Sequence, residues 1–474
     1  MINIDKNLVS EFNKLPLDFW DFKNADTKEL THGLHSYPAV MVYPISRNIL
    51  NIIKKYTTID SLLDPFMGSG TVLVEGMLAK IPHIYGSDLN PLAFLLSSVK
   101  TMPISKDELK MQCNTLYESI DNNYKNNANL LRKIDAFVTQ NQIDITAKDG
   151  WGDSAKTILK EFTQSENNDM TFLDFKNIGF WFTPKVIIEL QLIKNCIDNI
   201  GNARFKNFVL IAFSECVRLV SNRRNGEFKM YRMEASKVKS FNPDVYKTFS
   251  KILNQNILKM ISFSDICEKE NINSHLSILN ENSMFLNSIP DNSIDLIITS
   301  PPYGDSRTTV SYGEFSKVSL QWIDLDNTTY DDIKNIDKSL MGGMKYKKGY
   351  EYSLHSKTLK ESLKKIENID LERAGDVYSF YKDLENCIEC FSKKCRKDAY
   401  QFWVVGNRTV KNELLKTDII ISEIGEHYGL THVHTIDRNI INKVMPSKNS
   451  PTNVAGKKVT TMTNEHIVVL RKVE

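Results

Sequence analysis

Short apolar runs and helical patterns alternate over the first hundred residues. Residues 61–66 (SLLDPF) form an apolar run that stops at Asp-Pro, and apolar positions at residues 71–80 recur at helical spacing. Residues 83–88 (HIYGSD) have the pattern of a second strand. This strand–helix–strand succession is typical of the first half of a doubly wound sheet.

The pattern changes between residues 105 and 270, where long amphipathic helices are expected, for example over 184–200 and 207–220. Residues 293–299 (SIDLIIT) then form a buried strand. Two further strands are predicted at 401–405 and 466–470, with a helix over 417–428. We therefore predict an α/β, Rossmann-like fold with a mainly parallel twisted sheet flanked by helices. A large helical insertion interrupts it.

These patterns set the expected domain boundaries. One discontinuous domain comprises residues 1–104 and 271–474, and the inserted helical domain comprises residues 105–270. Residues 324–376 form a second polar excursion containing MGGMKYKKG (341–349). We expect that excursion to be a mobile basic loop or subdomain with helical flanks.

Composition narrows the class of protein. The chain has 474 residues, of which 41% are apolar and 25% charged, as in soluble proteins of two or three domains. With a net charge of only +2, any nucleic-acid surface must be a local basic face. No leader or membrane-spanning run is evident, and the seven cysteines are an odd, scattered set. We expect a cytoplasmic protein with reduced thiols and no membrane partner.

A glycine-rich turn, DPFMGSG at residues 64–70, follows the first strand and opens a helix. A phosphate loop would need a Lys after Gly70, and a dinucleotide fingerprint would need a third glycine where Leu73 stands. Asp64 would meet a cationic ligand end, such as the amino group of a methionine moiety, and Asp88 would bind ribose hydroxyls. A tight turn capped by Asp64 fits the spacing equally well, so both interpretations stay open.

The tetrapeptide Ser300-Pro-Pro-Tyr303 ends the buried strand at 293–299. Two prolines stiffen the backbone and leave carbonyls pointing outward. The Ser300 hydroxyl and a proline carbonyl would accept the two hydrogens of a base amine, and Tyr303 would stack on a flipped ring. A merely rigid turn is the alternative, but the buried strand and the complete tetrapeptide favour a reacting-base site.

Together the two motifs resemble those of the amino-methylating DNA methyltransferases of bacterial modification systems. Residues 32–39 (HGLHSYPA) resemble the segment that helps these enzymes enclose the methionine end of their cofactor, and 88–91 (DLNP) resemble their ribose-binding tip. Asn282 stands where an acid commonly meets the cofactor adenine. The resemblance implies S-adenosylmethionine as cofactor, bound by the following residues: Tyr37, Pro38, Asp64, Pro65, Phe66, Gly68, Ser69, Gly70, Asp88 and Asn282.

The resemblance also implies the reaction. In this family Ser-Pro-Pro-Tyr is associated mostly with cytosine N4, and Asp- or Asn-Pro-Pro-Tyr with adenine N6. Methylation of a flipped cytosine in double-stranded DNA is therefore expected, with adenine N6, an RNA base amine and a catalytically silent binding module as alternatives. The catalytic set is Ser300, Pro301, Pro302 and Tyr303.

The resemblance assigns residues 105–270 to target recognition and raises a cognate restriction endonuclease as a partner. It leaves the oligomeric state open. No Pro-Cys dipeptide occurs, which argues against carbon-5 methylation of cytosine through a thiolate.

Basic residues gather between 218 and 239, with Phe228 and Tyr231 interleaved. The run suits a phosphate clamp or a solvated helix face, and the pattern does not choose between them. Cys387 and Cys390 lie in a helical pattern over 381–395, so we expect core cysteines and no metal. The candidate DNA contacts are Arg218, Arg223, Arg224, Lys229, Arg232, Arg307, Arg438 and Lys443.

Overall fold

The computed structural model describes residues 4–23, 25–147, 151, 154–224, 230–305, 309–325, 328–343, 346, 349–440, 448–449, 459–460 and 464–473. A seven-stranded sheet with the order β3-β2-β1-β4-β5-β11-β8 forms its centre. Strands β1 to β5 are parallel, and β11 runs antiparallel between β5 and β8. The predicted α/β, Rossmann-like class is confirmed. The strands are β1 (Ser61–Asp64), β2 (His83–Ser87), β3 (His275–Leu279), β4 (Ile294–Thr299), β5 (Cys395–Val405), β8 (Leu430–Asn439) and β11 (Asn464–Lys472).

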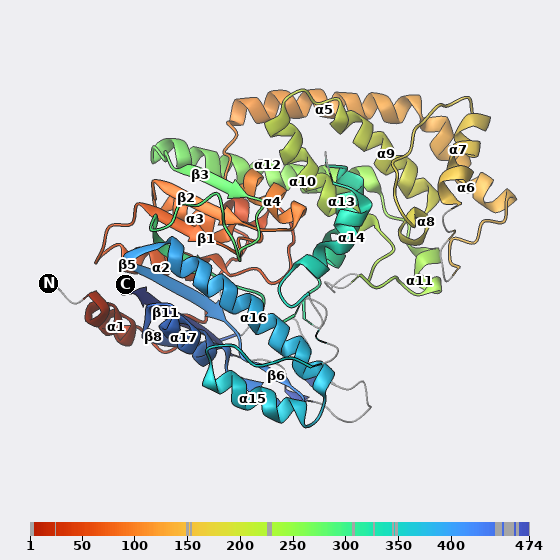
Figure 1. Cartoon of the computed structure of the whole chain (residues 1–474). Coiled ribbons are helices and arrows are strands. Elements are labelled where there is room, and N and C mark those ends of the chain that lie inside the picture. Colours follow the sequence, from red (N-terminus) through yellow and green to blue (C-terminus); the bar gives the residue numbers. More distant parts are fainter. Residues whose placement is uncertain are drawn as a thin grey trace.

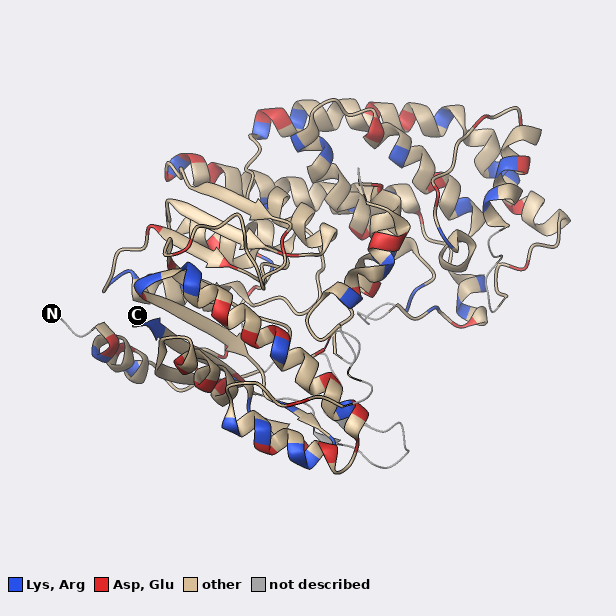
Figure 2. Cartoon of the chain, viewed as in Figure 1, with Lys and Arg blue, Asp and Glu red and all other residues tan. Residues whose placement is uncertain are grey.

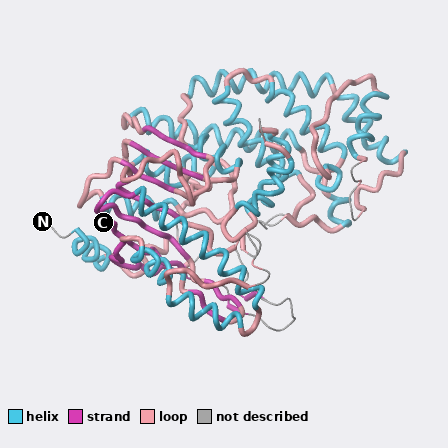
Figure 3. The backbone as a smooth tube through the Cα atoms, viewed as in Figure 1, coloured by secondary structure: helices cyan, strands magenta, loops and turns pink. Residues whose placement is uncertain are grey.

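Helices cover both faces of this sheet (Figure 3). Because successive strand residues point to opposite faces, Leu62 and Leu296 pack with one layer of helices while Leu63 and Ile297 pack with the other. The first layer contains α2 (Tyr43–Ile53), α3 (Thr71–Leu78) and α4 (Pro91–Lys100). The second contains α15 (Lys357–Glu367), α16 (Leu371–Lys394) and α17 (Thr417–His427).

The insertion forms a helical lobe between α4 and β3 (Figure 1). The predicted helices at 184–200 and 207–220 are present as α9 and α10. The lobe helices are α5 (Lys106–Asn126), α6 (Ala128–Gln140), α7 (Ala155–Ser165), α8 (Ile178–Trp181), α9 (Pro184–Asp198), α10 (Ala203–Val220), α11 (Ala235–Ser240) and α12 (Val245–Lys269). Next to α10 lies α13 (Tyr312–Ile323), against which α14 (Tyr330–Ser339) packs.

Smaller elements complete the described chain. They are the helices α1 (Ile4–Lys14) and η1 (Leu30–Gly33) and the short strand pairs β6 (Arg408–Val410) with β7 (Glu413–Leu415) and β9 (Lys448–Asn449) with β10 (Val459–Thr460). Among the described residues, no helix is long and apolar enough to cross a membrane. All seven cysteines are buried and free, and Cys387 and Cys390 lie in α16, as their helical pattern predicts.

Helices α14 and α15 flank the basic segment at 341–349, as expected for residues 324–376. Met344, Lys345, Lys347 and Lys348 lie outside the described residues, so the expectation of a mobile loop stays a prediction. Acidic and basic side chains are interspersed along α15 and α16 (Figure 2), in keeping with a net charge of +2. The charge pattern of these helices therefore marks no single-signed face.

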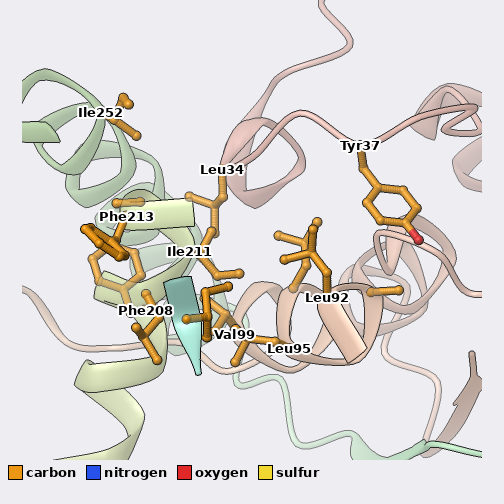
Figure 4. Close-up of a cluster of buried hydrophobic side chains, with 14 of the residues drawn as sticks. Leu34, Tyr37, Leu92, Leu95, Val99, Phe208, Ile211, Phe213 and Ile252 are labelled. Atoms are coloured by element: carbon orange, nitrogen blue, oxygen red, sulfur yellow. The ribbon is translucent and has the colours of Figure 1, made fainter. Parts of the chain in front are cut away.

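The lobe and the sheet share one hydrophobic core (Figure 4). Leu92 and Leu95 of α4 belong to the same buried cluster as Phe208 and Ile211 of α10. This continuity makes the lobe part of the same folding unit as the first helical layer, although it is an insertion in the sequence.

Replacement of Ile211 by Ala tests this shared core. Ile211 is fully buried, so Ile211→Ala is expected to lower the free energy of unfolding by about 2–5 kcal/mol in one cooperative transition. Denaturant unfolding followed by circular dichroism measures the effect. Met111→Ala, at a position of α5 that is 62% exposed, is the matched control and should change little. A loss confined to one of two separate transitions would contradict a common core.

Candidate active site

The carboxyl ends of β1 and β4 meet at the point where the strand order reverses. From β1 the chain proceeds outward through β2 and β3, whereas β4 and β5 extend the sheet in the other direction. Open α/β sheets bind ligands in the crevice at such a switch point. Asp64 ends β1 and Thr299 ends β4, and the Thr299 hydroxyl donates a 2.7 Å hydrogen bond to Asp64 Oδ1. The glycine turn and the Pro-Pro motif are therefore adjacent.

The glycine turn adopts a backbone that other residues rarely take. Gly68 and Gly70 have φ values of +46° and +73°. A Cβ at Gly70 would lie 2.8 Å from the Ser97 hydroxyl oxygen, while that hydroxyl donates to the Gly68 carbonyl at 3.0 Å. The Gly68 N–H donates to Asp88 Oδ2 at 3.0 Å. These contacts tie the turn to the ends of β2 and α4.

Asn90 holds the segment at residues 32–39 against this turn. Its side-chain amide donates to the Tyr37 hydroxyl at 3.0 Å and to Ser316 Oγ at 2.8 Å, and its carbonyl oxygen caps α4 by accepting from the Leu92 N–H. The Tyr37 ring lies 3.5 Å from the position of a Cβ on Gly68. Asn90 was not among the predicted site residues, although an Asn directly before Pro91 is a typical helix-start signal.

The two loops line one open pocket of about 890 Å³, a size common for small-molecule sites. From the predicted cofactor set it is lined by Tyr37, Pro38, Asp64, Phe66, Gly68, Ser69, Asp88 and Asn282, and from the catalytic set by Ser300 and Pro302. Sequence reasoning missed the apolar wall provided by Met41, Leu340 and Met341. Pro65, Gly70, Pro301 and Tyr303 do not line this pocket.

Two buried carboxylates give the pocket its charge. Burial raises the pKa of Asp64 to about 7, and burial likewise raises the pKa of Asp88 to about 6. Asp64 Oδ1 accepts from Thr299 and from the Phe66 N–H, but no described protein group donates to Oδ2. A cationic group at Asp64 and hydroxyl donors at Asp88 would favour the ionised forms of both side chains.

A chain of hydrogen bonds leads away from Ser300. Its hydroxyl donates to the Tyr303 oxygen at 3.4 Å, and the Tyr303 hydroxyl donates to Glu465 Oε1 at 3.0 Å. Burial places the pKa of Tyr303 well above its usual value. Arg438 pairs with Glu465 and donates from Nε to the Trp20 carbonyl at 2.9 Å. Glu465 was missed by sequence reasoning because it follows Ser300 by more than 160 positions.

The structure corrects the position expected for Arg438, whose side chain is 7% exposed. It supports Glu465 from inside the protein instead of presenting its charge to a phosphate. Arg218 is likewise internal, being 2% exposed. Its guanidinium lies 3.4 Å above the Phe315 ring and donates to the Phe315 carbonyl, and burial lowers its pKa to about 9. Its place on the inner face of α10, seven residues after Ile211, explains this burial.

Two more of the predicted DNA contacts bond to backbone carbonyls. Arg223 is 6% exposed and donates to the Arg218 carbonyl at 2.9 Å. Arg232 donates to the carbonyls of Ala147 at 2.6 Å and Phe180 at 2.9 Å. Arg224 is exposed, as expected. Lys229, Arg307 and Lys443 lie outside the described residues.

Comparison with known proteins places the chain among named relatives. It is 38% identical to "Type II methyltransferase M.MvaI" of Kocuria varians over 478 aligned residues, which cover 98% of this chain and 97% of that protein. It is 26% identical to "Type II methyltransferase M.MjaII" of Methanocaldococcus jannaschii over 233 residues, covering 42% of this chain and 43% of the relative. No family model matches the chain, and no solved structure matches it significantly.

The raised pKa of Asp64 predicts a pH-dependent cost to folding. Between its ordinary pKa of 3.8 and about 7, the folded protein keeps a proton that the unfolded chain releases, so this side chain lowers the free energy of unfolding as pH rises. Asp64→Asn should remove this effect and gain stability relative to wild type, on the order of 3 kcal/mol, from pH 4 to 7.

Denaturant unfolding across that pH range measures the difference. Asp60→Asn, at an exposed position just before β1, is the control and should show no such trend. A constant difference between wild type and Asp64→Asn would contradict the assignment.

Proposed function

This chain belongs to the type II methyltransferase family, and from that premise we propose that it methylates DNA. The methyl group would pass from S-adenosylmethionine to the N4 amine of a cytosine flipped out of the duplex. The observation that carries this proposal is the hydrogen bond between Thr299 and Asp64, because it sets a ligand pocket against the Ser-Pro-Pro-Tyr motif.

The residues present fit the cofactor. The free Oδ2 of Asp64 suits the ammonium of a methionine moiety, and Asp88 suits ribose hydroxyls. Tyr37 closes the turn side of the pocket, and Asn282 lines it on the side that follows β3. Once bound, S-adenosylmethionine supplies an electrophilic methyl group on a sulfonium.

The protein's own groups position the base amine. Ser300 donates its hydrogen to Tyr303, which leaves lone pairs on its oxygen for an amine N–H, and a proline carbonyl accepts the second hydrogen. The nitrogen lone pair is then directed at the methyl carbon, with Tyr303 placed to stack on the base. Serine at the first position of the motif favours cytosine N4 over adenine N6.

Exposed basic groups near the pocket provide a surface for the DNA backbone. Lys334 and Lys338 are exposed on α14, which leads directly into the pocket residues Leu340 and Met341. Arg224 of the lobe is exposed, as are Lys237 and Lys239 of α11. We assign phosphate contact to these groups and target recognition to residues 105–270. Protection of DNA from a cognate restriction endonuclease is the role that such methylation would serve.

Nucleoside analysis of the methylated product tests this function. Purified protein with methyl-labelled S-adenosylmethionine should label plasmid DNA and leave tRNA unlabelled. After digestion, mass spectrometry should find N4-methylcytosine. N6-methyladenine in its place would overturn the choice of base, and labelling of tRNA alone would overturn the choice of DNA.

Ser300→Ala is the matched control for chemistry at this site. Loss of the hydroxyl should lower the transfer rate by about 10²-fold, while calorimetry should find unchanged affinity for the cofactor. Activity equal to that of wild type would contradict the role given to Ser300.

A further inference from the structure

We propose that Glu465 receives the proton that the target amine releases, through a chain formed by the hydroxyls of Ser300 and Tyr303. This inference rests on the proposed function and adds a residue to its chemistry. Glu465 does not reach the pocket itself and acts through Tyr303, so it is a positioning residue that also serves as the final proton acceptor.

The sheet topology brings this chain together. Ser300 and Tyr303 follow β4, whereas Glu465 is the second residue of β11. Strand β5 lies between β4 and β11, so the Tyr303 side chain connects groups on either side of it. The two hydrogen bonds measure 3.4 Å and 3.0 Å. The longer one involves Ser300, and hydrogen bonds at reacting groups commonly tighten when substrate binds.

Glu465 sets the direction of both hydrogen bonds. An ionised carboxylate only accepts, so the Tyr303 hydroxyl must donate to it, and the Tyr303 oxygen is then free to accept from Ser300. Ser300 is left with acceptor lone pairs for the substrate amine. Arg438 stabilises this arrangement because it occupies Oε2 of Glu465 and leaves Oε1 to Tyr303.

The transfer of a methyl group creates the proton that needs an acceptor. The amine nitrogen forms a bond to the methyl carbon, the carbon–sulfur bond breaks, and its electron pair goes to sulfur. The nitrogen becomes cationic and releases one proton to Ser300 Oγ. Ser300 passes its own proton to the Tyr303 oxygen, and the Tyr303 proton passes to Glu465 Oε1. Both hydroxyls are restored, and Glu465 ends neutral.

Other carboxylates are less suited to this task. Asp64 and Asp88 line the cofactor side of the pocket. Asp305, close to the motif in sequence, is paired with Arg373 at 3.1 Å and Arg408 at 3.4 Å. Within the described ranges, Glu465 is the carboxylate that hydrogen bonds connect to Ser300. Its side chain is 14% exposed, so it can release the proton to solvent afterwards.

The test compares Glu465→Gln, Tyr303→Phe and the double variant. Gln has a single acceptor oxygen, which Arg438 will take, so the side chain keeps its size but no longer accepts from Tyr303. Tyr303→Phe keeps the ring and removes the relay hydroxyl. Each single variant should lower the single-turnover methylation rate by about 10²-fold. The double variant should lose no more than either, because both changes break one chain.

Binding measurements separate proton transfer from shape. The target site is first located by methylation-sensitive sequencing, and a duplex carrying 2-aminopurine at the target then reports base flipping in the presence of sinefungin. Base-flipping fluorescence and the Kd for sinefungin should match wild type in both single variants. Asp437→Asn is the matched control: it removes a neighbouring carboxylate that is 77% exposed and should leave the rate unchanged.

Each result has a distinct meaning. Wild-type rates in Glu465→Gln or Tyr303→Phe, or losses that add in the double variant, would overturn the proton chain while leaving methylation of DNA intact. Weakened base flipping in Glu465→Gln would also overturn it, since Glu465 would then act on shape. A wild-type protein that methylates no DNA would instead overturn the proposed function itself.

Discussion

The hydrogen bond from Thr299 to Asp64 joins two segments that lie 235 positions apart in the sequence. It forms because β1 and β4 are parallel neighbours in register, with Leu62 opposite Leu296 and Leu63 opposite Ile297. Both partners are buried, so the bond also lessens the cost of placing a carboxylate there. One shift in register would separate the ligand turn from the Pro-Pro motif, and the pocket depends on this pairing.

The helical lobe uses several of its cations internally. Arg218 stacks on Phe315, and Arg232 bonds to three carbonyls around α8 and the end of α6. Such contacts hold irregular backbone in place where no strand or helix partner exists. The lobe can therefore present a fixed surface beside the pocket, and its DNA-facing charges must come from other, exposed side chains.

Much of this arrangement was predictable from the sequence. The buried strand at 293–299, the glycine turn and the Ser-Pro-Pro-Tyr motif predict a switch-point pocket because parallel strands end at one edge of a sheet. Arg218 and Glu465 were not predictable in this way. A run of charges does not reveal which members face inward, and Glu465 precedes an ordinary apolar strand whose neighbour is set only by the strand order.

The affinity of Thr299→Val for S-adenosylmethionine tests the central claim most directly. Valine keeps the shape of the side chain but removes the donor to Asp64, whose pKa should then rise further and leave less carboxylate at pH 7 to hold a cationic ligand. Isothermal titration calorimetry should find a Kd raised about tenfold, with the unfolding temperature nearly unchanged. An unchanged Kd would contradict the account.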